Sequence, residues 1–553
     1  MPTIRKHFLI AIAGLSLVAA LLVGCSAATP TLVNPTAEPQ ALGAPVEQTA
    51  IPIPEPTLAL VAPTEKPVKL VNPGFEIKDT NGMPVGWNNT GTSDAILIED
   101  RGYSGNLRLT HKSSEAYQVE TSQDVSGLND GWYTLHGWAR SSGGQNEVYM
   151  ALTCGGAERR VQVPSTMPGY RWIQLVVSNQ AAGGKCTISL HSDGNPETWA
   201  SFDDIELIPG RAELFILGAD ISSLKKSEDK GGIYREADGT KQDALKILKD
   251  HGLNYARLRV WMNPADGYHN KAELLTMASR LKSQGIKLLV DFHYSDSWAD
   301  PGKQNKPTAW AHDDFEQLKK DVYDHTFDVC NSLVAQGTPP DMVQIGNEIN
   351  AGILWPDGKY DHMDNLAALL KEGYKAVKDC SPSTLVMLHI AEGGNNDTAR
   401  WFFDNMVQRD VPFDVIGVSY YPYLHGTLGQ LQDNLNDISA RYGKDVIVAE
   451  SAYAFTDQGN DSLANIANSG MAVPGYPFTP EGQRDMLRGV MSIVRAVPDG
   501  RGLGVFYWDA TWIAVPGNGW DPTDPKSGNA WENQALFDYT GKVLPALDEY
   551  LNP

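Results

Sequence analysis

Two glutamates each close a short apolar run. Glu348 ends the run that begins at Met342, and Glu450 ends the run that begins at Asp445. Each run has the composition of a buried strand, and in an α/β barrel the groups at the strand ends carry the chemistry. Two carboxyls, one protonated and one ionised, can break a glycosidic bond between them. A single such Glu is often a solvated strand end or a structural partner, so the prediction rests on the pair.

The elements that must position this pair repeat along the chain from Phe215 onward. Apolar strand-like runs alternate there with helical segments, which indicates βαβ units, and Lys241–Asp250 has the amphipathic period of an outer helix. We predict strands at 215–219, 255–261, 287–293, 342–348, 385–391, 415–421, 445–450 and 504–508. Eight such units predict a (β/α)8 TIM barrel. Glu348 then closes strand four and Glu450 strand seven, and near-opposed strand ends can hold two carboxyls close enough for a retaining mechanism.

The other predicted strand ends are rich in polar and aromatic residues that suit a sugar ligand. Singly, His293 or Trp508 would more often be a satisfied core residue, but packing does not explain polar and aromatic groups at so many ends. An arginine near the nucleophile would keep it ionised, and Arg259 is our candidate. We predict these substrate-binding residues: Arg259, Asn263, His293, Asp296, Trp298, Asn347, Tyr421, His425 and Trp508.

Five longer motifs, in order along about residues 213–550, resemble glycoside hydrolase family 53, the arabinogalactan endo-β-1,4-galactanases. They are Gly218–Leu224, Asn254–Trp261, Val290–Pro301, Gln344–Gly352 and Asn533–Asp538. The resemblance implies endo-hydrolysis of β-1,4-galactan, which forms side chains of pectin as type I arabinogalactan. It also implies that Glu348 is the proton donor (acid/base) and Glu450 the nucleophile, with no cofactor required for the chemistry.

Two alternatives remain beside this reading. Two glutamates on strands four and seven also serve retaining barrel endo-hydrolases of other β-1,4-glycans, such as mannan or glucan. A chain that captures a glycan without cutting it, as a non-catalytic lipoprotein, is the alternative from another class. Intact Glu348 and Glu450 argue against it, because a protein that only binds needs neither.

The resemblance extends to a metal. Some bacterial members of the family carry a structural calcium in the loop after strand seven, which here reads Asp457–Asn465. Leu463 and Gly459 occupy places where ligands would be expected. Oxygen ligands at alternating positions suit calcium, and the candidates that remain are Asp461, Asn465 and Glu532.

A different pattern precedes the barrel. From Val68 to Pro209, short alternating runs are separated by Gly, Asn, Asp and Ser, which predicts an all-β sandwich. Its entry Leu70–Glu76 and exit Phe202–Leu207 look like sandwich carbohydrate-binding modules, and the neighbouring galactanase-like region favours the galactan-binding family 61. Tryptophans stack on sugars, although at least half of those here should be core. The candidates are Trp87, Trp132, Trp138, Trp172 and Trp199.

The first residues read as a targeting segment. Arg5 and Lys6 precede an apolar run that is short for a membrane span. Leu22-Val-Gly-Cys25 resembles the lipobox of bacterial lipoproteins, whose Cys is lipidated, and an ordinary secretory signal is the alternative. The predicted organisation is a lipoprotein signal peptide at 1–24, a Pro/Thr-rich disordered tether at 25–66, the β-sandwich module at 67–210 and the barrel at 211–553. We expect an exported protein, anchored to the membrane through Cys25 at the bacterial cell surface, or secreted.

Charge and cysteine content limit the partners. The formal net charge of −22 argues against nucleic acid as a ligand, whereas a neutral galactan is indifferent to it. We expect a monomer. No CxxC spacing occurs, so a thiolate zinc site is not expected. In an exported chain, Cys154 with Cys186 is the favoured disulfide, and Cys330 with Cys380 the weaker one.

Overall fold

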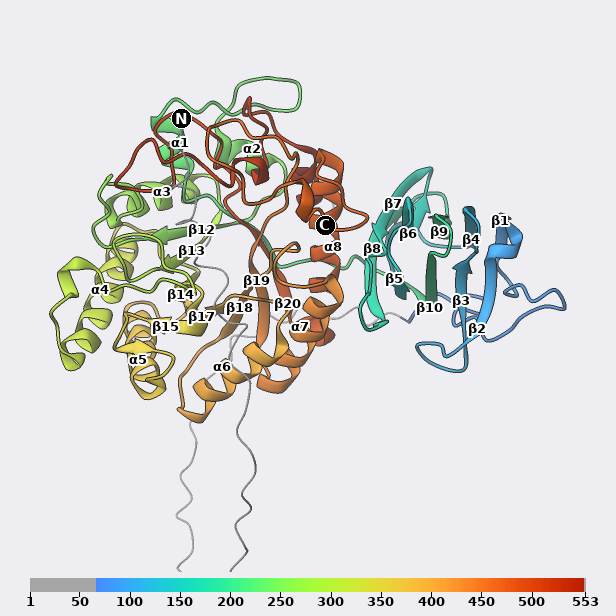
Figure 1. Ribbon diagram of the computed structural model, residues 1–553, viewed down its shortest axis with the longest axis horizontal. Coiled ribbons are helices and arrows are strands. Elements are labelled where there is room, and N and C mark those ends of the chain that lie inside the picture. The colour runs from blue at the N-terminus through green and yellow to red at the C-terminus, as the bar shows by residue number, and fades with distance from the viewer. Residues whose placement is uncertain (1–65, 552–553) are drawn as a thin grey trace, which may run out of the picture. The chain divides into compact units, whose positions relative to one another are not determined.

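The computed structural model describes residues 66–551, which contain two folded regions (Figure 1). The predicted signal peptide, Cys25 and nearly all of the predicted tether lie outside the described residues. No helix in the described part of the chain is long and apolar enough to cross a membrane.

The first region consists of two five-stranded antiparallel sheets, ordered β1-β4-β9-β6-β7 and β2-β3-β10-β5-β8. Apolar side chains of alternate strand residues fill the space between the sheets, as in a sandwich. The all-β prediction is confirmed, with a single 3-10 turn at Ser93–Ala95. The strands are β1 Asn88–Gly91, β2 Ile96–Asp100, β3 Leu107–Lys112, β4 Tyr117–Ser126, β5 Gly131–Ser141, β6 Glu147–Cys154, β7 Ala157–Gln162, β8 Ile173–Ala181, β9 Lys185–Gly194 and β10 Trp199–Pro209.

The second region is a closed barrel of eight parallel strands, as predicted. The strands are β11 Ile216–Asp220, β12 Tyr255–Val260, β13 Lys287–Phe292, β14 Met342–Ile345, β17 Leu385–Ile390, β18 Val415–Ser419, β19 Asp445–Ser451 and β20 Gly502–Tyr507. The predicted fourth strand is too long, because it ends at Ile345 and not at Glu348. A short hairpin, β15 Gly352–Ile353 with β16 Gly358–Lys359, follows it.

The inside of the barrel changes from apolar to polar along the strands. A buried cluster that includes Tyr255 and Leu289 fills one end. Two residues further along the same strands, the buried side chains are Arg257 and Asp291. Successive side chains of a strand alternate between its faces, so residues two apart share the interior face. Charged residues therefore gather inside at the carboxyl ends of the strands.

Helices surround the barrel strands in Figure 1. The predicted helix at Lys241–Asp250 begins later than expected, because the side chain of Asp243 accepts a hydrogen bond from the Lys246 N–H and caps the helix. Helix α5 packs closely on β14, since a Cβ added to Gly373 would lie 2.8 Å from Ile345 Cγ2. The helices are α1 Leu224–Asp229, α2 Ala244–Asp250, α3 Lys271–Ser283, α4 Phe315–Ala335, α5 Met363–Cys380, α6 Asn396–Gln408, α7 Leu428–Tyr442 and α8 Pro480–Arg495.

Both cysteine pairs form disulfides. Cys154 and Cys186 face each other in register on β6 and β9, and Cys330 of α4 is bonded to Cys380 at the end of α5. The four cysteines of the described residues are thus all oxidised, which suits an exported protein.

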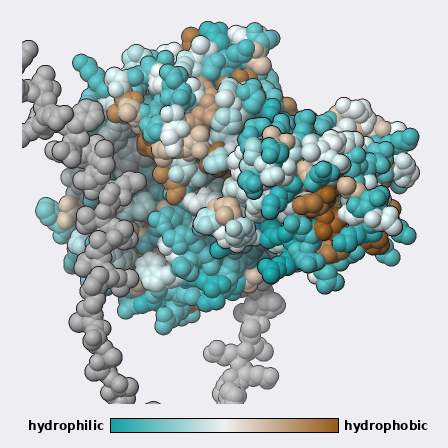
Figure 2. Space-filling model, turned by 45° about the vertical axis from the view of Figure 1, so that its right-hand side comes forward, coloured by the Kyte–Doolittle hydropathy of each residue, from teal (hydrophilic) through white to brown (hydrophobic). Residues whose placement is uncertain are grey.

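The face shown in Figure 2 is mostly hydrophilic, and its hydrophobic residues lie in small separate groups. This agrees with the short set of large apolar side chains that are exposed in the described part of the chain. Single exposed apolar residues are normal on soluble proteins.

Candidate active site

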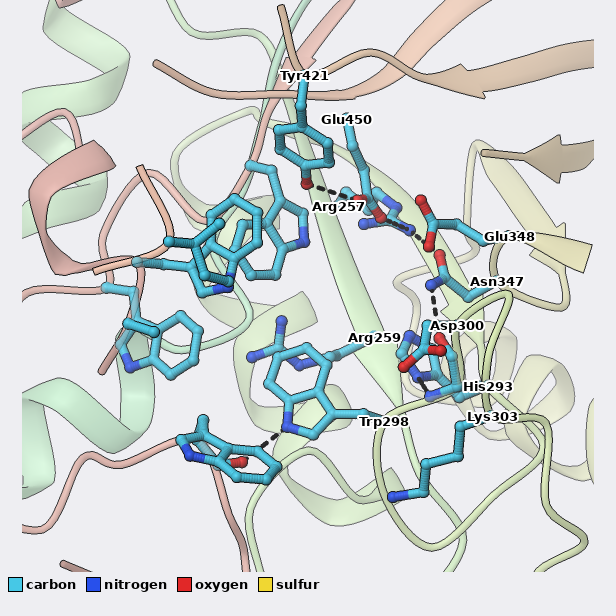
Figure 3. Close-up of a pocket in the computed structure, with 17 residues that line it drawn as sticks. Arg257, Arg259, His293, Trp298, Asp300, Lys303, Asn347, Glu348, Tyr421 and Glu450 are labelled. Atoms are coloured by element: carbon cyan, nitrogen blue, oxygen red, sulfur yellow. Dashed lines mark hydrogen bonds and ion pairs between the residues drawn. The ribbon is translucent and has the colours of Figure 1, made fainter. Parts of the chain in front are cut away.

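Glu348 lies just beyond the end of β14, on a sharply turned backbone. Gly346 has φ +81°, and Glu348 itself has φ +48°, the left-handed conformation that a side chain rarely adopts. A single 3-10 turn, Ile349–Ala351, follows directly. Strained backbone of this kind gathers at functional sites. Here it turns the Glu348 side chain into the pocket at the end of the barrel (Figure 3).

Glu450 lies on β19 and is almost completely buried, with 5% of its surface exposed. One carboxylate oxygen lies 2.9 Å from Nη2 of Arg257, and the other accepts a 2.8 Å hydrogen bond from the Tyr421 hydroxyl. Figure 3 shows the carboxylates of Glu450 and Glu348 pointing toward one another. The two predicted acids thus share one pocket.

The two acids differ in what surrounds them. Burial and then the charge of Glu450 raise the pKa of Glu348 to about 8, against an opposing hydrogen bond from Ser419. Burial also raises the pKa of Glu450, but the Arg257 charge and the Tyr421 hydrogen bond oppose that rise. Glu348 is therefore suited to hold a proton at neutral pH, and Glu450 to be ionised.

Arg257 organises the floor of the site. Its guanidinium lies 2.8 Å from Asp220 on one side and 2.8 Å from Asp291 on another, in addition to the contact with Glu450. It also donates to Asn347 at 2.8 Å. Although burial lowers the pKa of Arg257, these carboxylates raise it overall, so the group stays charged.

The partner of the nucleophile candidate differs from our prediction. We expected Arg259, but Arg257 contacts Glu450, and Arg259 donates to Asp509 at 3.1 Å and to Ser223 at 2.8 Å. The Arg259 guanidinium also lies 4.2 Å from the ring centre of Trp298, in the geometry of a cation–π contact. Arg259 does line the pocket, at the ring that a sugar could stack on.

The pocket has a volume of about 370 Å³ and is rich in indole rings. Of the predicted substrate-binding residues, those that line it are Arg259, His293, Trp298, Asn347, Tyr421 and Trp508. The other three are elsewhere: Asn263 is exposed, Asp296 accepts hydrogen bonds from the Asn263 and Thr308 N–H groups, and His425 packs behind Tyr421.

Several lining residues were missed in the sequence. Besides Arg257, they are Ala299, Asp300, Lys303, Ile466, Trp512, Trp520, Ala530 and Trp531. Trp512, Trp520 and Trp531 follow β20 in a long loop, where no strand periodicity shows which way a side chain points. Clustered tryptophans were the available signal, because rings that reach a polar pocket often stack on sugars.

A buried polar layer supports the two acids and was also missed. His389 Nε2 lies 2.9 Å from Ser419 Oγ, and Ser419 acts to lower the pKa of Glu348, against the rise that burial causes. The Gln344 side-chain N–H group donates to Asp291 at 2.7 Å. These groups occupy the interior positions of β13, β14, β17 and β18, so they fix the side chains above them.

The three calcium candidates lie close together. Glu532 Oε1 accepts hydrogen bonds from the backbone of Asn460 and Asp461, and the carboxylate of Asp461 is held by the N–H groups of Leu463 and Asn529. Glu532 Oε2 and Asn465 Oδ1 are buried without a hydrogen-bond partner. Two such oxygens fit a hard cation, although no cluster of three His, Cys, Asp or Glu ligands occurs among residues 66–551.

Comparison with known proteins identifies the family of the barrel region. Residues 216–550 match the family described as Glycosyl hydrolase family 53. An uncharacterized protein of Niallia circulans is 41% identical over 346 residues, which are 61% of this chain and 93% of the relative. An endo-beta-1,4-galactanase of Bacillus subtilis is 35% identical over 381 residues, 63% of this chain and 87% of the relative. The solved Ignisphaera aggregans GH53 catalytic domain has a TM-score of 0.59 and 38% identity, over 62% of this chain and 96% of that one. This chain therefore belongs to glycosyl hydrolase family 53.

Proposed function

We propose that Glu348 and Glu450 hydrolyse internal β-1,4-galactosidic bonds of galactan by a retaining double displacement. The chain is a glycosidase of family 53, and named relatives are endo-β-1,4-galactanases. The observation that carries the proposed roles is the pair of carboxyls that point toward one another: burial and Glu450 raise the pKa of Glu348 to about 8, and the buried Glu450 is held by Arg257 and Tyr421. The substrates are galactan and type I arabinogalactan of pectin.

In the first step, the protonated Glu348 gives its proton to the glycosidic oxygen while a Glu450 oxygen attacks the anomeric carbon. The bond between that carbon and the leaving oxygen breaks, and a galactosyl ester of Glu450 forms. Arg257 and Tyr421 hold the attacking carboxylate in place. Their contacts also disfavour protonation of Glu450 before attack, since both stabilise its charged form.

In the second step, Glu348 is ionised and takes a proton from water, which attacks the same carbon. The ester bond breaks, Glu450 returns as a carboxylate, and Glu348 is again protonated. Two inversions at one carbon give a product of unchanged anomeric configuration. The rings of Trp298, Trp508 and Trp531 line the same pocket and can stack on the sugars beside the cleaved bond.

A substrate panel tests the activity. Reducing-sugar release should be found on potato galactan and type I arabinogalactan, with a mixture of oligosaccharides as early products. Mannan and carboxymethylcellulose should give no release above that of a Glu348→Ala, Glu450→Ala double variant. If mannan or carboxymethylcellulose is cleaved in preference to galactan, galactan is not the main substrate and the preferred glycan takes its place in the proposal.

Azide rescue tests the two roles. In Glu348→Ala, a substrate with a good leaving group can still form the ester, so azide should restore turnover and yield a β-galactosyl azide. In Glu450→Ala the nucleophile is missing, so azide should attack from the opposite face and yield the α product. NMR of the two galactosyl azides gives their anomeric configurations. If the configurations are reversed between the two variants, Glu450 is the acid/base and Glu348 the nucleophile.

We also propose a structural calcium at Asp461, Asn465 and Glu532. The unpartnered oxygens of Asn465 and Glu532 support it, and the ion would compensate the buried charge of Glu532. The chemistry at Glu348 and Glu450 requires no metal. Metal analysis of the purified protein is the direct test.

We further propose that the protein is exported, that Cys25 carries a lipid at the bacterial cell surface, and that the sandwich is a carbohydrate-binding module for galactan. The lipobox-like Leu22–Cys25 supports the anchor, and a polymeric substrate supports a module that keeps the enzyme near it. Membrane fractionation tests the first, and affinity electrophoresis in galactan gels tests the second.

A further inference from the structure

We infer that one face of the sandwich is the surface that binds the glycan chain. It is formed by β5, β10 and the segments beside them, and we call it the aromatic face. Its residues are Tyr103, Trp138, Arg140, Tyr170, Trp172 and Trp199. The occupant is an uncharged β-linked glycan, and its identity as galactan rests on the proposed function.

Strand register places these side chains outside the core. Trp138 and Arg140 on β5 lie opposite Asp203 and Ser201 on β10. The residue between Trp138 and Arg140 is Ala139, which is fully buried. Because side chains alternate between the faces of a sheet, Trp138 and Arg140 point away from the core. Trp199 lies two residues before Ser201 and shares its side.

The rings and the guanidinium touch one another in a continuous row. The ring of Tyr103 is stacked on Trp138 with centres 3.7 Å apart. The ring of Trp172 is edge-on to that of Tyr103, with centres 6.2 Å apart. The Arg140 guanidinium lies 4.5 Å from the ring centre of Trp172 and 5.8 Å from that of Trp199. Tyr170 continues the row, with its ring 17° from parallel to Trp199.

The row is open to a ligand. Tyr103 is 43% exposed and Tyr170 is 56% exposed, so both outer rings present a large surface to solvent. The remaining tryptophan candidates of the sandwich have other roles. Trp87 is buried and donates to the Asn72 carbonyl, and the ring of Trp132 is covered by the Arg211 guanidinium at 4.3 Å.

The charges on this face suit an uncharged ligand. Arg108 is paired with Glu99 at 2.8 Å, and the fully buried Asp203 accepts the N–H groups of Tyr103 and Asp204. Arg140 Nε is buried and has no hydrogen-bond partner. Pyranose rings stack their C–H faces on aromatic rings, and a sugar hydroxyl can accept from a guanidinium. An anionic polymer would need several unpaired cations instead.

Tyr103→Ala and Tyr170→Ala test the inference, because both residues are exposed and their loss should not prevent folding. Ile77→Ala is the matched control, since Ile77 is a 57% exposed apolar residue of the sandwich outside the aromatic face. Each change is made in the full chain, in both the active and the Glu450→Ala background. Affinity electrophoresis in gels with potato galactan measures binding in the inactive background. Turnover of a soluble galactotetraose measures the barrel alone.

The Tyr103→Ala and Tyr170→Ala chains should bind galactan polymer about three- to tenfold more weakly than the Ile77→Ala chain, since one stacked ring contributes in that range. Turnover of the galactotetraose should be unchanged in all three. Equal retardation of all three chains would overturn the inference. Sedimentation gives a second outcome that would overturn it: wild type is a dimer and the Tyr170→Ala chain is a monomer. The aromatic face would then be an interface between two copies of the chain.

The outcomes separate this inference from the proposed function. If wild type cleaves galactan but the Tyr103→Ala and Tyr170→Ala chains bind galactan as strongly as the control, the aromatic face is not the glycan-binding surface. The proposed galactanase activity is then unaffected. A different result is that wild type does not cleave galactan, while the Tyr103→Ala and Tyr170→Ala chains are retarded less than the control in gels of mannan or xyloglucan. The proposed activity would then be wrong, and the aromatic face would be the binding surface for that other glycan.

Discussion

Glu348 is held where its own charge is unfavourable. Burial and the neighbouring Glu450 raise its pKa from 4.5 to about 8, so between these values the folded chain holds a proton that the unfolded chain releases. The free energy of unfolding must then fall as pH rises through this window. The role proposed for Glu348 uses the same property, because a general acid must keep its proton at neutral pH.

Glu348→Gln should therefore stabilise the fold while it abolishes efficient catalysis. Glutamine has nearly the same shape and cannot ionise, so the variant should melt several degrees above wild type at pH 8 and at the same temperature near pH 4. Thermal melts from pH 4 to pH 9 measure this, with the exposed Glu115→Gln as control. A gap between variant and wild type that does not grow with pH would contradict the raised pKa.

Sequence reasoning selected Glu348 and Glu450, which line one pocket, because each is a carboxylate at the end of an apolar run. The prediction that Arg259 contacts Glu450 was wrong, and the reason is also physical. Arg257 and Arg259 lie on the same face of one strand, so alternation predicts that both point inward but not how deep each lies. The deeper one meets Glu450. Asn263 and Asp296 lie past the strand ends, where spacing no longer fixes a direction.

At the scale of elements, the turn after β14 sets the position of Glu348. A Cβ on Gly346 would lie 2.5 Å from Ile349 Cγ2, and Gly346 has φ +81°. Gly346→Ala should therefore displace the turn and lower kcat on galactan at least tenfold, while the barrel still folds. Gly239→Ala is the control, because Gly239 has φ +89° but nothing within 4 Å of the added Cβ.

Both glycine variants should lose roughly 1 kcal/mol of stability, since alanine is disfavoured at positive φ. Only Gly346→Ala should lose activity. Assays of kcat on galactan and thermal melts on both chains separate the two effects. Full activity of Gly346→Ala would show that the turn does not control the acid.

The loop that holds the calcium candidates gives a second prediction at this scale. Purified wild type should contain about one calcium per chain, and a chelator should lower its melting temperature by several degrees. Glu532→Gln should remove both effects, because an amide replaces the buried unpartnered oxygen while the other oxygen can still accept the backbone N–H groups. Asp524→Asn, an exposed acid between β20 and Glu532, is the control. A wild type without calcium, indifferent to the chelator, would end the proposal.

All eight barrel strands were predictable because parallel strands covered on both faces read as apolar runs. The residues at which these strands end were harder to predict. Strand β14 stops three residues before Glu348, since the left-handed turn that presents the acid cannot continue a ladder. The tryptophans of the loop after β20 were not predictable, because nothing in a loop's sequence states which cavity it covers.

At the scale of the whole molecule, the net charge of −22 and the aromatic pocket suit a chain that works on an uncharged polymer in water. The prediction here concerns location. Cys25→Ala should move the protein from the detergent phase to the aqueous phase, because the lipid that holds it to a membrane is lost. Phase partitioning with Triton X-114 measures this, and Ser26→Ala is the control. Partitioning that does not change with Cys25→Ala would show that no lipid is attached there.

Because of the two disulfides, a count of free thiols gives information on the proposed lipid anchor at Cys25. The sequence has five cysteines, and four of them are bonded in pairs within the described residues. A thiol reagent added to the denatured but unreduced protein therefore has only 5 − 4 = 1 sulfur left to find, that of Cys25. One thiol per chain would show a bare Cys25 and so exclude a lipid there, without any membrane. No thiol is expected from a lipidated chain and equally from a chain whose secretory signal was removed together with Cys25.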